Sequence, residues 1–198
     1  MLKRPRCPAC ERPASACICQ WVRPVQHEVK VLILQHPLEV TQAKGTARLL
    51  HMSLPGSRMV TGEMFDEHLF KGGRHVLLYP DTPQAGLPAA RSLSAEELTD
   101  LNSLCLVVLD GTWRKSLKML HMNPVLQKMP RLSLKNLPAS NYRIRKARLL
   151  HQLATLEATC AALAELEGNA GKFEPLLDAF DGFVGQQMWQ RTGSTFAR

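Results

Sequence analysis

The stretch Leu104-Cys105-Leu106-Val107-Val108-Leu109-Asp110-Gly111-Thr112-Trp113-Arg114-Lys115 decides the fold that the sequence predicts. Its six leading apolar residues, two of them β-branched, predict a strand buried on both faces, as in a parallel sheet. Asp110 stands where this strand ends, and Gly111 allows a sharp turn after it. Ligands of open α/β sheets bind beyond the carboxyl ends of the strands. Asp110 is therefore either a turn-forming residue or a functional carboxylate.

Strands and helices alternate along the rest of the chain. Apolar runs predict further strands at 29–35, 57–61, 75–79 and 131–134. Helical patterns predict helices at 39–52, 116–129 (interrupted by Pro124), 153–167 and 173–191, with a short one from Ser94. This alternation predicts an α/β fold with a largely parallel sheet and helices on both faces.

The size and composition of the chain indicate a soluble protein. Its 198 residues suffice for one main domain, predicted at 25–198, with a small N-terminal unit at 1–24. No apolar run approaches the roughly 18 residues of a membrane span, and the basic N-terminus leads into cysteines instead of an apolar signal segment. We therefore expect a cytoplasmic protein without a membrane partner. The sequence marks no oligomer interface.

The positive charge is concentrated in one interval. The net charge is +8, and no acidic residue lies between Asp110 and Glu157. The interval holds ten cations, namely Arg114, Lys115, Lys118, Lys128, Arg131, Lys135, Arg143, Arg145, Lys146 and Arg148. Such a stripe is either a solvated surface or a site for a polyanion, and the asymmetry within one domain favours nucleic acid.

Four of the six cysteines lie close together near the N-terminus, at Cys7, Cys10, Cys17 and Cys19. Prolines exclude a long helix there, and in a cytosolic chain such a cluster indicates metal ligation before disulfides. Four thiolates suit a structural zinc ion, which would supply the folding energy that so short a segment lacks. Redox chemistry and an iron–sulfur cluster are the alternatives. Cys105 and Cys160 are expected in the core.

Several motifs resemble one known family. Asp110-Gly111-Thr112-Trp113 is similar to the Asp-x-Thr-Trp signature of the DTW-domain family. Three more pieces agree in order: His36-Pro37-x-Glu39, Tyr142-x-Ile144-Arg145-Lys146 and Leu153-x-Thr155-Leu156-Glu157-Ala158. The cysteine cluster also resembles that of bacterial members. One position departs from the pattern, because Ala154 stands where the family usually has serine.

The resemblance implies a fold and an activity. The fold would be SPOUT-related, with a knotted C-terminal part that binds S-adenosylmethionine as the donor. The activity would be transfer of the 3-amino-3-carboxypropyl group to N3 of a uridine in the variable loop of tRNA, with release of methylthioadenosine. An RNA methyltransferase using the same donor and a zinc-containing RNA-binding protein without catalysis are the alternatives.

The expected catalytic residues are Asp110, Thr112 and Trp113. N3 of uridine must lose its proton before it can attack, and a carboxylate at a strand end is a reasonable general base. The alternative role of Asp110 is to cap the following helix. Trp113 could stack on the target base or on adenine, or could fill the core. His36 ranks below Asp110 because it could be an ordinary loop histidine.

Two further sets complete the predicted site. Donor-binding residues are expected at Tyr79, Pro80, Gly111, Leu134, Thr155 and Glu157. RNA-binding residues are expected at Arg4, Lys44, Arg114, Lys115, Arg143, Arg145 and Lys146. The pair Arg145-Lys146 could instead bind the carboxylate of the donor through a bidentate arginine contact. Glu157 would receive the ammonium group of the donor, or else only favour the dipole at its helix N-terminus.

Overall fold

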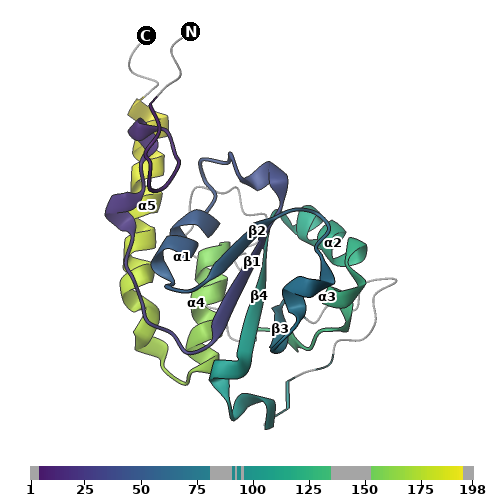
Figure 1. Cartoon of the computed structure of the whole chain (residues 1–198). Coiled ribbons are helices and arrows are strands. Elements are labelled where there is room, and N and C mark those ends of the chain that lie inside the picture. The colour runs from purple at the N-terminus through teal and green to yellow at the C-terminus, as the bar shows by residue number, and fades with distance from the viewer. Residues whose placement is uncertain (1–4, 81–90, 92, 95, 135–152, 194–198) are drawn as a thin grey trace.

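A five-stranded sheet forms the centre of the computed structural model, which describes residues 5–80, 91, 93–94, 96–134 and 153–193. Every pairing in the sheet is parallel. The strand order is β2-β1-β4-β3-β5 (Figure 1). The strands are β1 (Lys30–Gln35), β2 (Arg58–Thr61), β3 (Arg74–Leu78), β4 (Leu104–Asp110) and β5 (Arg131–Leu132). The predicted α/β fold with a parallel sheet is confirmed.

The central strands are apolar on both faces, which is why they sit in the middle of the sheet. Side chains of a strand alternate between its faces, so β4 contributes Leu106 and Val108 to one core and Val107 and Leu109 to the other. Both cores are closed to solvent by helices, and the molecule has three layers.

Helices cover the two faces of the sheet unequally. Figure 1 shows α1 (Ala47–Ser53), α4 (Thr155–Leu166) and α5 (Glu174–Gly193) on one side, and α2 (Trp113–Met122) and α3 (Pro124–Lys128) on the other. Short 3-10 helices occupy Ala14–Ala16, Cys19–Trp21, Pro37–Glu39, Glu67–Phe70, Glu96–Leu98, Leu101–Ser103 and Ala170–Phe173. None of the helices in the described ranges has the length and apolar character needed to cross a bilayer.

Three of the predicted helices differ from the structure in their bounds or in their type. The helix predicted at 39–52 begins only at Ala47, because turns close at Gln42 and Gly45 (N–H to the carbonyls of Glu39 and Gln42, 3.0 and 2.9 Å). The helix predicted at 116–129 begins earlier, at Trp113, and breaks before Pro124 into α2 and α3. The helix predicted from Ser94 is only a 3-10 turn at Glu96–Leu98. The predicted knot in the C-terminal part stays a prediction, because residues 135–152 lie outside the described residues.

The N-terminal cysteine segment packs against α5. Cys10 and Ile18 are buried in the same core as α1, α4 and α5. The guanidinium of Arg12 lies 5.4 Å from the ring centroid of Phe183, a favourable cation–π distance. The side-chain amide of Gln186 donates to the carbonyl of Cys17 (3.1 Å) and accepts from the indole N–H of Trp21. Helix α5 therefore ties the cysteine segment to the main body.

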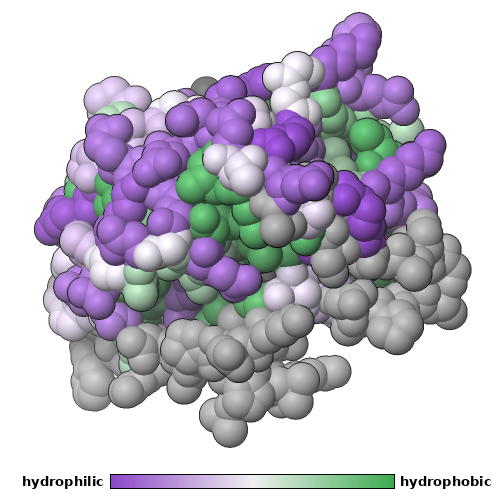
Figure 2. Space-filling model, turned by 90° about the horizontal axis from the view of Figure 1, so that it is seen from below, coloured by the Kyte–Doolittle hydropathy of each residue, from purple (hydrophilic) through white to green (hydrophobic). Residues whose placement is uncertain are grey.

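The face of the molecule that is seen from below the view of Figure 1 carries both hydrophobic and hydrophilic residues. Figure 2 shows hydrophobic residues gathered at the middle of this face, bordered by hydrophilic residues and by residues drawn in grey.

We predict that Gly182→Ala destabilises the protein. A Cβ at Gly182 would lie 2.1 Å from the ring of Trp21, so the ring must move away from α5. Overpacking of this kind costs roughly 1–3 kcal/mol, which thermal or urea unfolding would measure. Gly185→Ala is the matched control, because a Cβ there meets nothing within 4 Å on the same helix. Equal stability of the two variants would contradict this packing.

Candidate active site

Asp110 is held by donors from two other elements. Its side chain is 5% exposed at the end of β4. The side-chain amide of Gln35 donates to one carboxylate oxygen (Nε2 to Oδ2, 2.9 Å), and the hydroxyl of Thr155 donates to the other (Oγ1 to Oδ1, 2.8 Å). Donors of this kind favour the ionised form of a carboxylate, the form that can accept a proton. They also fix the orientation of Asp110.

Sheet register brings Gln35 to Asp110. The two residues are Cα partners in the parallel pairing of β1 with β4. The backbone N–H of His36 extends the pairing by donating to the carbonyl of Asp110 (2.9 Å). Because parallel strands end at the same edge of a sheet, the polar residues that terminate β1 and β4 lie side by side.

Thr155 is positioned by the N-terminus of α4. The Glu157 carboxylate accepts from the backbone N–H of Ala154 (2.7 Å), which is half of a capping box. Ala154 has no hydroxyl to complete it. The hydroxyl of Thr46 instead accepts from the N–H of Leu156 (3.3 Å). The loop before α1 therefore helps to cap α4.

Asp110 opens onto a cavity of about 280 Å³. This volume is just below the usual range of small-molecule pockets, about 300–1,000 Å³. The cavity is lined by Glu39, Gln42, Lys44, Gly45, Thr46, Asp110, Thr112, Lys115, Ala154 and Thr155. A second cavity of about 500 Å³ lies between the cysteine segment and the β1–α1 loop, and Glu39 and Gly45 line both.

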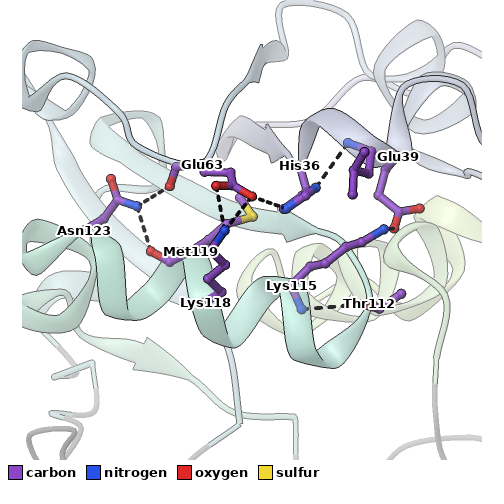
Figure 3. Close-up of polar contacts among 9 residues, drawn as sticks. His36, Glu39, Glu63, Thr112, Lys115, Lys118, Met119 and Asn123 are labelled. Atoms are coloured by element: carbon purple, nitrogen blue, oxygen red, sulfur yellow. Dashed lines mark hydrogen bonds and ion pairs between the residues drawn. The ribbon is translucent and has the colours of Figure 1, made fainter.

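A polar network fixes the wall of this site (Figure 3). The Nδ1 of buried His36 accepts from the N–H of Leu38 (3.1 Å), and its Nε2 donates to Glu63 (2.7 Å). Lys118 donates to both oxygens of Glu63 (3.0 and 2.8 Å) and thereby lowers the pKa of that carboxyl. Asn123 donates to the carbonyl of Glu63 (2.8 Å). The network ties the loops after β1 and β2 to α2.

Thr112 and Trp113 form the start of α2. The Thr112 hydroxyl accepts from the N–H of Lys115 (3.4 Å), so Thr112, and not Asp110, caps the helix. Trp113 is 47% exposed and stacks on buried Tyr79 (centroids 5.1 Å apart, planes at 11°). Of the three positions left open by the sequence, the core is therefore excluded for Trp113.

The predicted donor-binding residues fall in two places. Tyr79 and Pro80 follow β3, and Leu134 lies two residues beyond β5, at the carboxyl ends of these strands. Gly111 follows β4, and a Cβ there would lie 3.2 Å from the Cβ of Lys115. Thr155 binds Asp110, and Glu157 caps α4, which matches its alternative helix-terminus role.

Only three of the seven predicted RNA-binding cations belong to the described residues. Arg4, Arg143, Arg145 and Lys146 lie outside the described residues. Lys44 and Lys115 line the 280 Å³ cavity, and Arg114 is exposed on α2.

Two cations of the basic interval are paired with carboxylates that lie outside it in the sequence. Lys115 pairs with Glu39 (2.8 Å) and Lys118 with Glu63 (2.8 Å), because carboxylates from distant segments fold onto α2. A third cation, Arg131, is buried.

The sequence did not identify Gln35, Thr46 and Glu63 as site residues, and it indicated Arg131 only as one cation of the basic interval. Gln35 directly precedes the His-Pro motif, so its place at a strand end was a usable signal. Thr46, Glu63 and Arg131 acquire their roles only through contacts between distant segments.

The four N-terminal cysteines form a cluster that can hold a metal ion. Their sulfur atoms lie within 4.8 Å of one another, with Cys7–Cys19 at 3.6 Å and Cys10–Cys17 at 3.8 Å. A tetrahedral zinc site with bonds of about 2.3 Å has sulfurs roughly 3.8 Å apart. Backbone N–H groups of Cys10 and Ala9 lower the pKa of Cys7 to about 6. The donor set and its spacing fit zinc.

Comparison with known proteins gives related sequences. The tRNA-uridine aminocarboxypropyltransferase 2 of Mus musculus is 31% identical over 88% of this chain and 61% of its own length. The protein of the same name from Drosophila melanogaster is 31% identical over 84% of this chain and 68% of its own. The tRNA-uridine aminocarboxypropyltransferase A of Arabidopsis thaliana is 26% identical over 63% and 53%. No solved structure matches.

The chain spans about 61% of the length of the mouse and macaque relatives. The DTW domain family matches residues 4–188, which include the cysteine cluster, Asp110 and most of α5. This match covers nearly the whole chain and agrees with the motifs at His36, Asp110 and Thr155. The chain therefore belongs to the DTW domain family.

Proposed function

We propose that this protein is a transferase that moves the 3-amino-3-carboxypropyl group of S-adenosylmethionine to N3 of a uridine in the variable loop of tRNA. The observation that carries the proposal is the Asp110 carboxylate, oriented by Gln35 and Thr155 beside a cavity. The names of the relatives support the coarser part of this proposal, aminocarboxypropyl transfer to a uridine of tRNA.

Asp110 serves as the general base in this scheme. It accepts the N3 proton of the uridine, and the N3 electron pair then forms a bond to the Cγ carbon of the donor. The bond between Cγ and sulfur breaks with its electron pair on sulfur, which gives neutral methylthioadenosine. The proton on Asp110 returns to solvent. Because three carbons are bonded to the sulfonium, selectivity for Cγ comes from positioning.

The two substrates approach β4 from different sides. The 280 Å³ cavity lies toward the β1–α1 loop, has polar walls, and is the proposed place of the target uracil. Tyr79, Pro80 and Leu134 follow strands on the other side of β4 and are proposed to contact the donor. Trp113, which is half-exposed and stacks on Tyr79, is proposed to stack on a base. Lys44 and Arg114 are proposed to contact the tRNA backbone.

The cysteine segment is proposed to be a structural zinc knuckle at residues 1–24 that is attached to a SPOUT-like catalytic domain at 25–198. Its sulfur geometry fits zinc, and its contacts with α5 are extensive. We propose that the reaction takes place in the cytoplasm, where a tRNA substrate would be met.

We predict that Asp110→Asn abolishes aminocarboxypropyl transfer without loss of folding or tRNA affinity. Loss of a general base costs about 100- to 10,000-fold in rate. Unmodified tRNA would be incubated with S-adenosylmethionine, and its nucleosides analysed by mass spectrometry. Asp100→Asn, an exposed carboxylate before the start of β4, is the control. Full activity of Asp110→Asn would refute its role, and a mass gain of one methyl group would identify a methyltransferase instead.

We predict one zinc ion per chain, measured by elemental analysis of the purified protein. Cys10→Ser should lose the ion and lower the melting temperature, because the metal-bound segment is part of the core around α5. Cys105→Ser is the control, since Cys105 lies on β4 outside the cluster. A zinc content unaffected by Cys10→Ser, or iron in its place, would contradict the assignment.

A further inference from the structure

Arg131 is a buried cation, and two of its three guanidinium nitrogens lack a hydrogen-bond partner among the described residues. Its residue is 5% exposed, and neither Nε nor Nη2 has a hydrogen-bond partner among the described residues. Among the described residues, four buried side-chain nitrogen or oxygen atoms lack a hydrogen-bond partner. Three of these four atoms belong to Arg131 and Tyr79. Native proteins satisfy nearly all such groups, so a cluster of exceptions calls for an explanation.

The two residues are neighbours at the β3–β5 edge of the sheet. Arg131 is the Cα partner of Leu77, and its guanidinium carbon lies 5.7 Å from the centroid of the Tyr79 ring. The hydroxyl of Ser116, which faces this region from α2, donates to the carbonyl of Trp113 (3.0 Å). The phenol oxygen of Tyr79 remains without a hydrogen-bond partner in the described chain.

A buried charge without a partner is strongly unfavourable in the ligand-free protein. Packing alone would be better served by an apolar side chain of the same length, such as methionine. The presence of a cation at position 131 is explained if an anionic ligand accepts hydrogen bonds from its guanidinium group. Residues that destabilise the unliganded protein in this way are typical of binding sites.

The open donors define the shape of the anion. The N–H groups at Nε and Nη2 lie on one edge of the planar guanidinium and point in parallel. Two oxygens of a carboxylate match this edge with two parallel hydrogen bonds. A phosphodiester of folded tRNA would have to bring its two neighbouring sugars to a side chain that is almost wholly buried. A small carboxylate on a flexible arm fits better.

We propose that Arg131 binds the α-carboxylate of the 3-amino-3-carboxypropyl arm of S-adenosylmethionine, an inference that rests on the proposed function. Tyr79 adds its hydroxyl as a further hydrogen-bonding group, and its ring stacks on the ring of Trp113. Arg131 therefore selects a donor that carries the group to be transferred.

The test compares two donors that differ only in this carboxylate. Calorimetry would measure the affinity of wild type and Arg131→Met for S-adenosylmethionine and for its decarboxylated analogue. We expect wild type to prefer S-adenosylmethionine by about 10- to 100-fold, the value of a charge-assisted hydrogen-bonded pair. In Arg131→Met this preference falls to near unity, through loss of affinity for S-adenosylmethionine alone. Arg131→Lys, which keeps the charge without the two-pronged edge, is intermediate.

Two controls separate binding from structure. Arg74→Met removes a half-buried arginine at the start of β3, whose Nε donates to Ser103 (3.1 Å), and leaves the donor preference unchanged. Thermal unfolding without ligand should show Arg131→Met at least as stable as wild type, because an unpaired buried charge is removed. A large loss of stability would indicate a structural partner for Arg131 and overturn the proposal.

The remaining outcomes are distinct. If wild type binds S-adenosylmethionine and Arg131→Met keeps the full preference, the carboxylate is bound elsewhere and the inference is wrong. If Arg131→Met weakens tRNA binding and keeps the preference, Arg131 is a phosphate site and the inference is again wrong. If wild type binds neither donor, the proposed function fails together with the inference.

Discussion

The parallel pairing of β1 with β4 is the constraint on which the rest of the structure depends. Its register places Gln35 beside Asp110 at the edge where both strands end. A slip of one residue would turn the apolar side chains of each strand to the wrong face and carry Asp110 away from its amide donor. The same two strands contribute to both cores, so the forces that bury them also fix the geometry of the site.

Around this edge, the polar groups are assembled by loops and helix termini from distant parts of the chain. Thr46 caps α4, which holds Thr155 against Asp110, and the pairs Lys115–Glu39 and Lys118–Glu63 fasten the loops after β1 and β2 to α2. A base that must meet an incoming uridine in one orientation benefits from such a rigid wall, because positioning accounts for a large part of catalysis. The arrangement also uses cations that would otherwise be available to RNA.

The sequence predicts some levels of this structure better than others. Long apolar runs identify β1 and β4 because burial on both faces leaves a continuous hydrophobic pattern. The start of α1 is mispredicted because residues 39–46 have helix-forming composition, while turns at Gln42 and Gly45 decide the backbone. Asp110 is recognisable from its place at a strand end. The ion pair of Lys115 with Glu39 and the burial of Arg131 cannot be recognised from the sequence, because both depend on which distant segments fold against these residues.

The central claim is that Asp110 faces the N3 atom of the target uridine. A crystal structure of the protein with methylthioadenosine and a uridine-containing tRNA fragment tests it most directly. We expect N3 to lie within hydrogen-bond distance of the Asp110 carboxylate, with the sulfur on the side of Tyr79 and Pro80. A uridine bound with N3 turned away, or separated from Asp110 by the sheet, would contradict it.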